Sequence, residues 1–535
     1  MKIELLDCTL RDGAYIVDSM FGTTAMKGII SHLQDAQVNI IEVGWLKDKP
    51  HQEGSSFYHV PADAEPYIVN KNPNCLYVAM IDWNRYDDSV LPPYDGKSID
   101  AVRVVFPYGK HKEGIEIGLR IREKGYIVMF QAANTLAYQN EDLIALAEAM
   151  NEIHPASLSV VDTFGAMYEE DLERIVTCLD AHLDKGIKMG IHTHNNQQMA
   201  FALSLCFIRL MKKAGRDMMI DASLSGMGRG AGNATTELVA NYLNKKCDCH
   251  FNVDAIMDAI DVYMGYYHEN YEWGYSTPYC IAGMYCCHVN NIAYLLKNHR
   301  TSSKDMRLII ESLSPEDRKK YDYDLLEEKY IENQSRYIDD AAAVQQLSEL
   351  LTARSILLVA PGKSSIDEQT KIQEYIQINQ PLVIGVNAII PGYQYDFLFF
   401  VNPARYEYAR NSHPEVFAST PKILLSNIKQ QAETKETIIG FNTVIKRGWQ
   451  HFDNAVICAL RLMDKLGVTN VSIAGFDGFQ HKYNESYADA YLPTLNPDNQ
   501  WDALNEEITA MFADFKKHAS HCKNIYFVTD SLFNQ

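Results

Sequence analysis

The sequence predicts an α/β protein with an N-terminal (β/α)8 TIM barrel, a helical extension, and a C-terminal Rossmann-like α/β domain. Over residues 1–245, short apolar runs alternate with helical stretches, which is typical of β/α units around a parallel sheet. Residues 246–352 read as long helical stretches that we expect to pack on the barrel. Apolar runs ending in polar or glycine turns return over residues 353–535 and predict an open, doubly wound sheet. A chain of 535 residues is too long for one hydrophobic core, so several domains are expected.

The barrel is predicted from eight short segments rich in apolar and β-branched residues. They are Ile3–Leu6, Ile40–Val43, Leu76–Ile81, Ala101–Phe106, Ile127–Phe130, Leu158–Val161, Met189–His192 and Met218–Ile220. The segments between them have helical periodicity, as in Asp142–Ile153. Eight such units fit a closed barrel in which each strand is followed by a helix.

Polar side chains follow most of the predicted barrel strands. They are Asp7, Arg11, Asp12, Glu42, Asp82, Gln131, Asn134, Asp162, His192, His194 and Asp221. An isolated aspartate after a strand more often caps the next helix than takes part in chemistry. So many polar residues at the carboxyl ends of the strands, where barrel active sites lie, nevertheless predict a catalytic rim.

His192 and His194 are the first candidates for metal ligands. They lie two residues apart at the end of an apolar strand, so both imidazoles share one face. The alternative is a pair of hydrogen-bonded polar residues that bind no metal. Asp12 follows the first strand, which neighbours the last one in a closed barrel, and a carboxylate with two imidazoles suits a divalent metal. Asn233, in the glycine-rich segment Gly226–Asn233, is placed to add an amide oxygen or to brace the site.

Four segments of the N-terminal region resemble one enzyme superfamily. They are DCTLRDG (Asp7–Gly13), IEVG (Ile41–Gly44), GIHTHNN (Gly190–Asn196) and DASLSGMGRGAGNATTE (Asp221–Glu237). Together they resemble the DRE-TIM metallolyases (HMG-CoA lyase-like), and among these the 4-hydroxy-2-oxovalerate aldolases look most similar. The resemblance covers residues 1–245 and implies that Asp12, His192 and His194 bind a divalent metal. Mn²⁺ is the expected ion, with Mg²⁺, Zn²⁺ and Co²⁺ as alternatives.

The resemblance also implies roles for residues beside the metal. Arg11 would polarise the substrate carbonyl and stabilise an enolate, and Glu42 would hold Arg11 in place. Tyr15 stands where the aldolases carry a histidine base. Because tyrosine has a reference pKa of about 10, it is a poor resting base, and we expect Tyr15 to donate a hydrogen bond or to stack on the substrate.

Three further residues are candidates for substrate binding. Gln131 and Asp162 follow the fifth and sixth strands and therefore face the same rim. Arg103 lies in the fourth strand. It either reaches inward to a carboxylate or phosphate of the substrate, or points outward and pairs with a helix.

These features predict a divalent-metal-dependent aldolase or lyase that forms or cleaves a carbon–carbon bond through the enolate of a pyruvate-like 2-oxo acid. The expected partners are the 2-oxo acid and an aldehyde or sugar-derived compound. One alternative is a Claisen-type acyl-CoA synthase or carboxyl transferase that uses the same enolate. Another is a non-catalytic binding or scaffold protein derived from a barrel enzyme.

Composition argues against several classes of partner and location. A formal net charge of −20 argues against a nucleic-acid partner, because phosphate binding needs a basic surface. No apolar run approaches the roughly 20 residues that cross a bilayer, so no membrane partner is expected. The first residues mix charged and apolar side chains, unlike a signal peptide, and we expect a cytoplasmic protein whose 11 cysteines are reduced. A homo-oligomer is left open.

The C-terminal region contains one phosphate-binding pattern of low specificity. Gly362, Lys363 and Ser364 follow an apolar strand, and backbone amides in such a turn can bind a phosphate. The first glycine of a Walker A motif would fall on Leu357, which excludes that motif. Two roles of the C-terminal domain remain possible from the sequence. It either binds a nucleotide or a sugar phosphate, or it serves oligomerisation or support.

Overall fold

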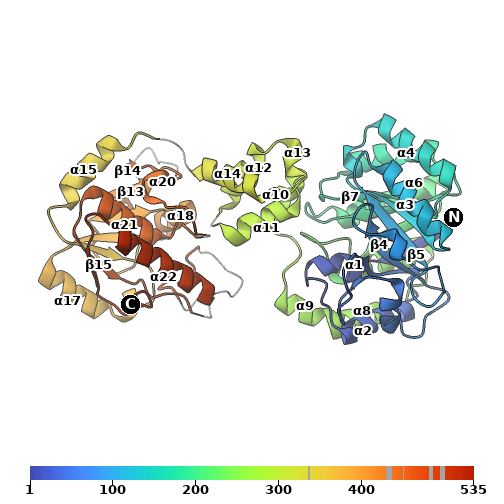
Figure 1. The fold of residues 1–535 in the computed structure, drawn as a ribbon, viewed down its shortest axis with the longest axis horizontal. Helices are drawn as coiled ribbons and strands as arrows, with labels where there is room; N and C mark the ends of the chain where they lie inside the picture. Colours follow the sequence, from blue (N-terminus) through green and yellow to red (C-terminus); the bar gives the residue numbers. More distant parts are fainter. Residues whose placement is uncertain are drawn as a thin grey trace. The chain divides into compact units, whose positions relative to one another are not determined.

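All eight predicted barrel strands are present in the computed structural model of the chain (Figure 1). The structure describes residues 1–299, 301–334, 338–428, 436–449, 451–480, 486–493 and 501–534. The barrel strands are β1 (Ile3–Asp7), β2 (Ile40–Leu46), β4 (Leu76–Asp82), β5 (Ala101–Phe106), β6 (Ile127–Ala132), β7 (Ser157–Asp162), β8 (Lys188–Thr193) and β9 (Met218–Ala222). Neighbouring strands are parallel, and pairing of β1 with both β9 and β2 closes the barrel. A short strand, β3 (Phe57–Tyr58), pairs with the end of β2.

Helices follow six of the eight barrel strands. They are α2 (Thr23–Asp35), α3 (His111–Glu123), α4 (Asn140–Ile153), α5 (Glu169–His182), α6 (Ala200–Ala214) and α7 (Thr236–Cys247). The expectation of a helix after every strand is wrong after β2 and β4, where the connections contain short 3₁₀ turns and no α-helix. Both connections contain prolines, among them Pro61, Pro66 and Pro92, and proline lacks the N–H group that a helix interior needs.

The barrel interior has an apolar layer at the level of Ile40, Ala101 and Met219. Moving two residues along a strand returns to the same face, so the next inward residues are Glu42 on β2, Arg103 on β5 and Asp221 on β9. Gln131 occupies the same position on β6, two residues after Met129. All four polar side chains are buried. A polar layer therefore lies above the apolar one, toward the carboxyl ends of the strands.

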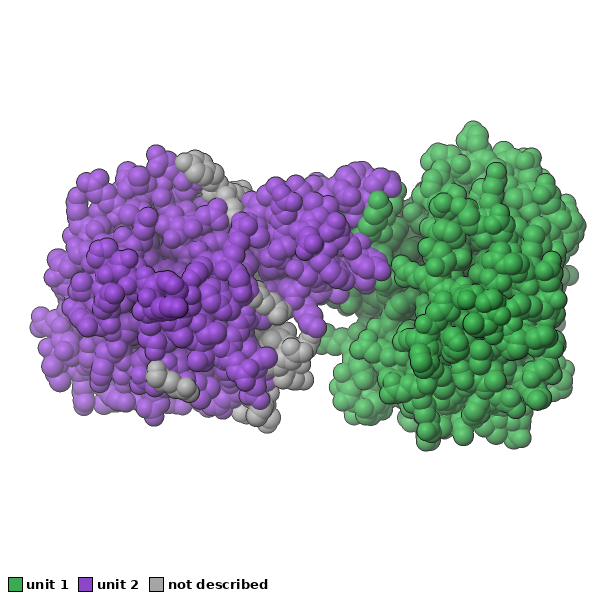
Figure 2. Space-filling view, in the orientation of Figure 1, with its two compact units in different colours: residues 1–289, 318–320 green, residues 290–317, 321–535 purple. Residues whose placement is uncertain are grey.

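The chain separates into two compact units (Figure 2). The barrel unit contains residues 1–289 and 318–320, and the C-terminal unit contains residues 290–317 and 321–535. These limits differ from the predicted boundaries at 245 and 352. Helix α8 (Val253–Ala259) stays with the barrel, because the backbone N–H of Asn252 donates to the carbonyl of Ala36 at the end of α2.

The predicted helical extension is thus divided between the two units. Its helices are α8 (Val253–Ala259), α9 (Gly265–Asn270), α10 (Thr277–Met284), α11 (Val289–Asn298), α12 (Ser303–Ser312), α13 (Pro315–Arg318), α14 (Tyr323–Gln334) and α15 (Ala341–Leu351). Helical periodicity shows that a segment is a helix but does not show which core receives its apolar face. The sequence pattern therefore could not assign this segment to either unit.

The C-terminal unit contains the predicted open parallel sheet. Its strands are β10 (Ile356–Val359), β11 (Leu382–Val386), β12 (Phe397–Phe400), β13 (Lys422–Leu425), β14 (Glu436–Ile439), β15 (Asn470–Ala474) and β16 (Asn524–Phe527). The helices are α16 (Ser364–Asp367), α17 (Gln369–Asn379), α18 (Pro403–Ser412), α19 (Pro414–Ser419), α20 (Phe441–Val444), α21 (Ala455–Leu466) and α22 (Trp501–His518). The strand order is β14-β13-β12-β11-β10-β15-β16, so the direction of winding reverses between β10 and β15.

Candidate metal centre

Asp12, His192 and His194 come together at the carboxyl end of the barrel. Asp12 ends the short helix α1 (Thr9–Asp12), which follows β1, while His192 lies in β8 and His194 directly after it. One potential ligand atom from each side chain lies within 4.8 Å of the other two, and all three residues are buried. Within the described part of the chain, no other cluster of His, Cys, Asp and Glu side chains has this geometry.

Neighbouring groups orient the two imidazoles. Nδ1 of His194 lies 3.0 Å from the carbonyl oxygen of Asp162, and Nδ1 of His192 lies 3.1 Å from Oδ2 of Asp221. The His192 contact is within ion-pair distance but lacks hydrogen-bond geometry. A proton on each Nδ1 would face these oxygens and leave each Nε2 lone pair for a metal. Burial lowers the pKa of His192, which favours the neutral ring that a metal ligand requires.

Asn233 completes a donor set that fits a divalent cation. Its Nδ2 donates to Oδ2 of Asp12 over 2.6 Å, so its side chain is held beside the cluster. Its Oδ1 is buried and has no hydrogen-bond partner, although a buried amide oxygen normally accepts one. Two imidazoles, a carboxylate and an amide oxygen form a mixed N/O set suited to Mn²⁺, Zn²⁺ or Mg²⁺.

The glycine-rich loop after β9 lets Asn233 approach Asp12 closely. A Cβ atom on Gly228 would lie 2.2 Å from Nδ2 of Asn233 and 2.7 Å from Oδ2 of Asp12. A Cβ atom on Gly232, whose φ is +82°, would lie 2.0 Å from the carbonyl oxygen of Gly226. Side chains at these positions would displace the cluster, so the glycines serve close packing around it.

Arg11 lies beside the cluster, and two acidic groups hold its guanidinium in place. Its Nε donates to Glu42 over 2.7 Å, its NH1 lies 2.5 Å from Asp12, and its NH2 lies 3.5 Å from Nε2 of His192. Burial alone would raise the pKa of Asp12, but the Arg11 guanidinium and His194 hold it well below its usual range. Asp12 is therefore ionised, as a metal ligand must be.

Arg103 points into the barrel, but its position does not fit the direct substrate contact considered from the sequence. Its guanidinium forms ion pairs with Glu42, at 2.9 Å, and with Asp221, and its side chain has no exposed surface. Arg103 thereby joins the carboxylate that holds Arg11 to the carboxylate that orients His192. Arg103 therefore supports the site indirectly, by holding the carboxylates of Glu42 and Asp221 in place.

Asp221 belongs to the site although its position on the last strand only marked it as one rim residue among many. It contacts His192 on one side and Arg103 on the other. Burial alone would raise the pKa of Asp221, but Arg103 and His192 keep it low. The signal that would have found it is strand parity, because Asp221 is two residues after the inward-facing Met219.

Gln131 and Asp162 are buried near the rim, where their polar groups contact protein. Gln131 donates to the hydroxyl of Ser159 over 2.8 Å. The carboxylate of Asp162 accepts the amides of Ala166 and Met167, and burial raises its pKa to about 6. Asp162 thus shapes the loop after β7 and orients His194 through its carbonyl. Substrate binding by these two residues stays a prediction.

Tyr15 is exposed at the mouth of the barrel. Its ring lies against Trp45 with centroids 6.1 Å apart, and the guanidinium of Arg229 lies 4.7 Å from its centroid. The protein around the phenol raises the pKa of Tyr15 to about 12, although Arg229 acts in the opposite direction. The hydroxyl therefore carries its proton at neutral pH.

The turn Gly362–Ser364 in the C-terminal unit is already paired with protein groups. The amide of Gly362 donates to the carbonyl of Gly475, and the amide of Ser364 donates to Oδ2 of Asp477 over 2.8 Å. Lys363 is exposed. A phosphate at this turn would meet the carboxylate of Asp477, which argues against the phosphate site considered for these residues.

Comparisons with known proteins agree with the barrel fold. The family model described as HMGL-like matches residues 110–262 and does not extend into the C-terminal unit. The 4-hydroxy-2-oxovalerate aldolase of Thermomicrobium roseum is 27% identical over 262 residues, which cover 45% of this chain and 67% of the aldolase. The oxaloacetate decarboxylase of Mycobacterium tuberculosis is 27% identical over 263 residues, which cover 48% of this chain and 74% of the decarboxylase.

A solved structure of the HMG-CoA lyase from Brucella melitensis is 16% identical, with a TM-score of 0.38, and the match covers 50% of this chain and 98% of the lyase. The fold and the Asp-His-His cluster define a closed parallel barrel with a candidate metal site. More particularly, residues 110–262 belong to an HMGL-like (DRE-TIM) domain. In the described ranges, no helix combines the length and apolarity needed to cross a membrane.

Proposed function

We propose that the barrel is a divalent-metal-dependent aldolase or lyase that forms or cleaves a carbon–carbon bond through the enolate of a pyruvate-like 2-oxo acid. One observation carries this proposal. Arg11 lies within contact distance of two members of the Asp12, His192 and His194 cluster, so a cationic side chain and a metal site converge on one point. Developing negative charge on a substrate oxygen needs this kind of preorganised positive environment.

Bound divalent metal would supply Lewis-acid stabilisation to the oxygens of the 2-oxo acid. The chain's own part is to keep the positive groups in place before substrate arrives. Glu42 accepts from Nε of Arg11 and also pairs with Arg103, so Arg11 cannot rotate away without breaking a buried ion pair. Its NH2 group, directed toward His192, is the donor best placed to meet an enolate oxygen.

Tyr15 is proposed as a hydrogen-bond donor to the substrate. Its raised pKa keeps the hydroxyl protonated, so it does not act as the resting base. Arg229 over the Tyr15 ring adds positive charge at the mouth. Both features suit the negatively charged 2-oxo acid and its product, with an aldehyde or sugar-derived compound as the proposed second substrate.

Oxaloacetate extends the same proposal. Loss of carbon dioxide from oxaloacetate also gives the enolate of pyruvate, and a decarboxylase is among the relatives at 27% identity. A Claisen-type synthase or a carboxyl transferase would use this enolate with a different partner. These reactions therefore differ in what attacks or leaves, while Arg11 and the metal cluster would serve each in the same way.

The test is exchange of the methyl protons of pyruvate with deuterated water, measured by mass spectrometry on the full-length protein. We expect exchange with added Mn²⁺ or Mg²⁺, loss of exchange in EDTA, and recovery when metal is returned. His194→Ala should abolish exchange, while His182→Ala, an exposed histidine on α5, should leave it unchanged. A protein that exchanges no 2-oxo acid with any divalent metal would instead fit the non-catalytic binding reading.

A second step identifies the partner. Aldehydes, acetyl-CoA, oxaloacetate and a carboxybiotin donor are each supplied under exchange conditions. Carbon–carbon bond formation with an aldehyde supports the aldolase. Release of CoA supports the synthase, and carboxyl transfer to or from pyruvate supports the transferase, either of which would replace the aldolase proposal.

A further inference from the structure

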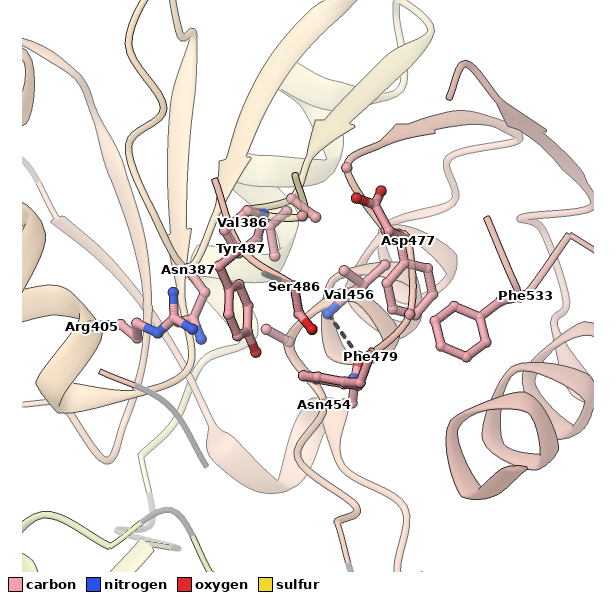
Figure 3. Close-up of a pocket in the computed structure, with 17 residues that line it drawn as sticks. Val386, Asn387, Arg405, Asn454, Val456, Asp477, Phe479, Ser486, Tyr487 and Phe533 are labelled. Carbon is pink, nitrogen blue, oxygen red and sulfur yellow. Dashed lines mark hydrogen bonds between the residues drawn. The ribbon is translucent and has the colours of Figure 1, made fainter. Parts of the chain in front are cut away.

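Polar side chains also gather away from the metal cluster, in each of the two units. In the C-terminal unit, Gly362, Asn387 and Asp477 line a cavity where the strand order reverses between β10 and β15 (Figure 3). Its volume of about 60 Å³ holds only a few molecules of the size of water. In the barrel unit, Lys47 directly follows β2 and forms an ion pair with Asp82 at the end of β4. This pair lies at the carboxyl ends of the barrel strands, where active sites of such barrels form.

A bulge in β2 turns Lys47 toward the mouth of the barrel. Glu42 on β2 is aligned with Val78 on β4, which faces the barrel interior. Three residues after Glu42, Trp45 is aligned with Met80, which is only two residues after Val78. Because aligned residues face the same side of a sheet, Trp45 faces inward, and so does Lys47 two residues later. Without the extra residue of the bulge, Lys47 would point out of the barrel.

Trp45 brings Lys47 close to Arg11. The indole Nε1 donates to the carbonyl oxygen of Arg11 over 3.0 Å, and the Arg11 guanidinium carbon lies 5.8 Å from the Trp45 ring centroid. Nζ of Lys47 lies 4.0 Å from the same centroid, and the ring of Tyr15 meets the indole edge-on. One buried indole therefore contacts the cation proposed to meet the enolate, the phenol proposed to bind substrate, and the ammonium group of Lys47.

The ion pair is partly exposed and has hydrogen-bonding capacity to spare. Nζ of Lys47 donates to Oδ2 of Asp82 over 3.0 Å, and 20% and 25% of the two side chains are exposed. An ammonium group has three donor hydrogens, so Lys47 can meet an oxygen of a ligand while it keeps its contact with Asp82. Burial and the charges of Asp12 and Asp82 raise the pKa of Tyr15, which places Asp82 at the same mouth as the phenol.

We propose that Lys47 is the general acid and base for the second substrate of the barrel, an aldehyde, and that Asp82 positions its ammonium group. This inference rests on the proposed function, which supplies the enolate. When the enolate carbon attacks the aldehyde carbon, a carbon–carbon bond forms and the π electrons of the carbonyl move to its oxygen. That oxygen takes a proton from Nζ of Lys47, and water returns a proton to the amine. Cleavage runs these steps in reverse, with the neutral amine as the base.

An aldehyde suits this pair better than the other partners considered for the enolate. Attack on an aldehyde creates an alkoxide, which needs a positive group and a proton. Decarboxylation of oxaloacetate and carboxyl transfer form no new hydroxyl group, so neither needs a second proton donor beside Arg11. The position of Lys47 therefore favours the aldol reaction among the reactions that share the enolate.

Two reactions of the full-length protein with Mn²⁺ separate this inference from the proposed function. The first is exchange of the methyl protons of pyruvate, which needs the enolate but no aldehyde. The second is formation of 4-hydroxy-2-oxo acids from pyruvate and acetaldehyde, glycolaldehyde or glyceraldehyde, measured by mass spectrometry. Without exchange, the proposed function fails and the inference fails with it. Exchange without an aldol product from any of these aldehydes overturns the inference alone.

Variants of the ion pair assign the proton transfer. Lys47→Arg keeps the positive charge, but a guanidinium does not lose its proton, so aldol turnover should fall by about 10²- to 10⁴-fold while exchange falls far less. Lys49→Arg, at an exposed position over the Phe57 ring, is the matched control and should keep aldol turnover. Asp82→Asn should lower kcat of the aldol reaction without changing the KM for pyruvate, and Asp82→Glu should restore part of kcat. Aldol turnover of Lys47→Arg near that of the wild type overturns the proposal.

Binding of inert hydroxy acids gives a readout that does not depend on turnover. The compound 2,4-dihydroxypentanoate carries the hydroxyl group that an aldol reaction would form, 2-hydroxypentanoate lacks it, and neither has the carbonyl group needed for cleavage. In calorimetry with Mn²⁺, the dihydroxy acid should bind about tenfold more tightly, the usual effect of a hydrogen bond to a charged group. Lys47→Met, with folding checked by circular dichroism, should abolish this difference, and Lys47→Arg should keep part of it. Equal binding of the two acids by the wild type, or a full difference in Lys47→Met, overturns the proposal.

Discussion

In the barrel unit, charged side chains at the carboxyl ends of the strands pair with one another across a closed ring, whereas in the C-terminal unit Arg405 and Asp477 line opposite sides of a cavity at the edge of an open sheet. Closure places β2, β5 and β9 around one axis, so Glu42, Arg103 and Asp221 meet although they are far apart in sequence. In the open C-terminal sheet, by contrast, polar side chains gather where the strand order reverses, between β10 and β15.

This difference between the two units predicts which site is more sensitive to substitution. A buried network of charges is costly to break, because each lost partner leaves an uncompensated charge. Asp477, which lines the C-terminal cavity, is only partly buried, so its substitution should change stability less. The barrel site should therefore be more sensitive than the C-terminal cavity.

Loss of a metal ligand should have the largest effect. His194→Ala removes one of the three clustered groups, and we expect bound metal to be lost and pyruvate exchange to fall by about 10³-fold or more. Metal content is measured by plasma mass spectrometry, with His182→Ala as the control. Full metal occupancy in His194→Ala would show that the cluster is not the metal site.

Arg11→Lys should have the next largest effect. Lysine keeps the positive charge but cannot contact Glu42, Asp12 and a substrate oxygen together, so turnover should drop by about 10²- to 10³-fold with metal content unchanged. Arg122→Lys, at an exposed position on α3, is the control. Normal turnover in Arg11→Lys would make Arg11 a structural residue only.

Asp221→Asn should have an intermediate effect, centred on metal affinity. Losing the carboxylate that orients His192 should weaken metal binding by about 10- to 100-fold. Asp248→Asn, exposed after α7, provides the matched control. Because Asp221 also pairs with Arg103, thermal unfolding is measured in parallel, and an unchanged metal affinity would limit Asp221 to stabilising the barrel.

Separation of the two units should have the smallest effect on the metal centre. All residues of the cluster, together with Arg11, Glu42 and Asp221, lie within residues 1–289. A fragment of these residues should fold and bind metal with the stoichiometry of the full chain, since the barrel has its own core. An insoluble or metal-free fragment would show that the units depend on one another.

Much of the barrel was predictable because its signals are local. Each strand is a short apolar run, and the histidines two residues apart share a face in any strand. The grouping of Asp12 with His192 and His194 followed from closure, which makes the first and last strands neighbours. The missing helices after β2 and β4 and the strand β14 were not predicted, because periodicity in short segments is ambiguous.

The sequence by itself determined the strands, the parallel sheets and the residues of the candidate metal cluster, since these depend on side-chain periodicity and on neighbouring strands. Only the tertiary structure decided that Arg103 pairs with Glu42 and Asp221 instead of facing a substrate, because that depends on which inward side chains meet across the barrel. The tertiary structure likewise decided which polar groups meet at the carboxyl ends of the strands in the C-terminal unit. Asp477 follows β15, more than one hundred residues after Ser364, and accepts the amide of Ser364; Arg405 lines the same cavity.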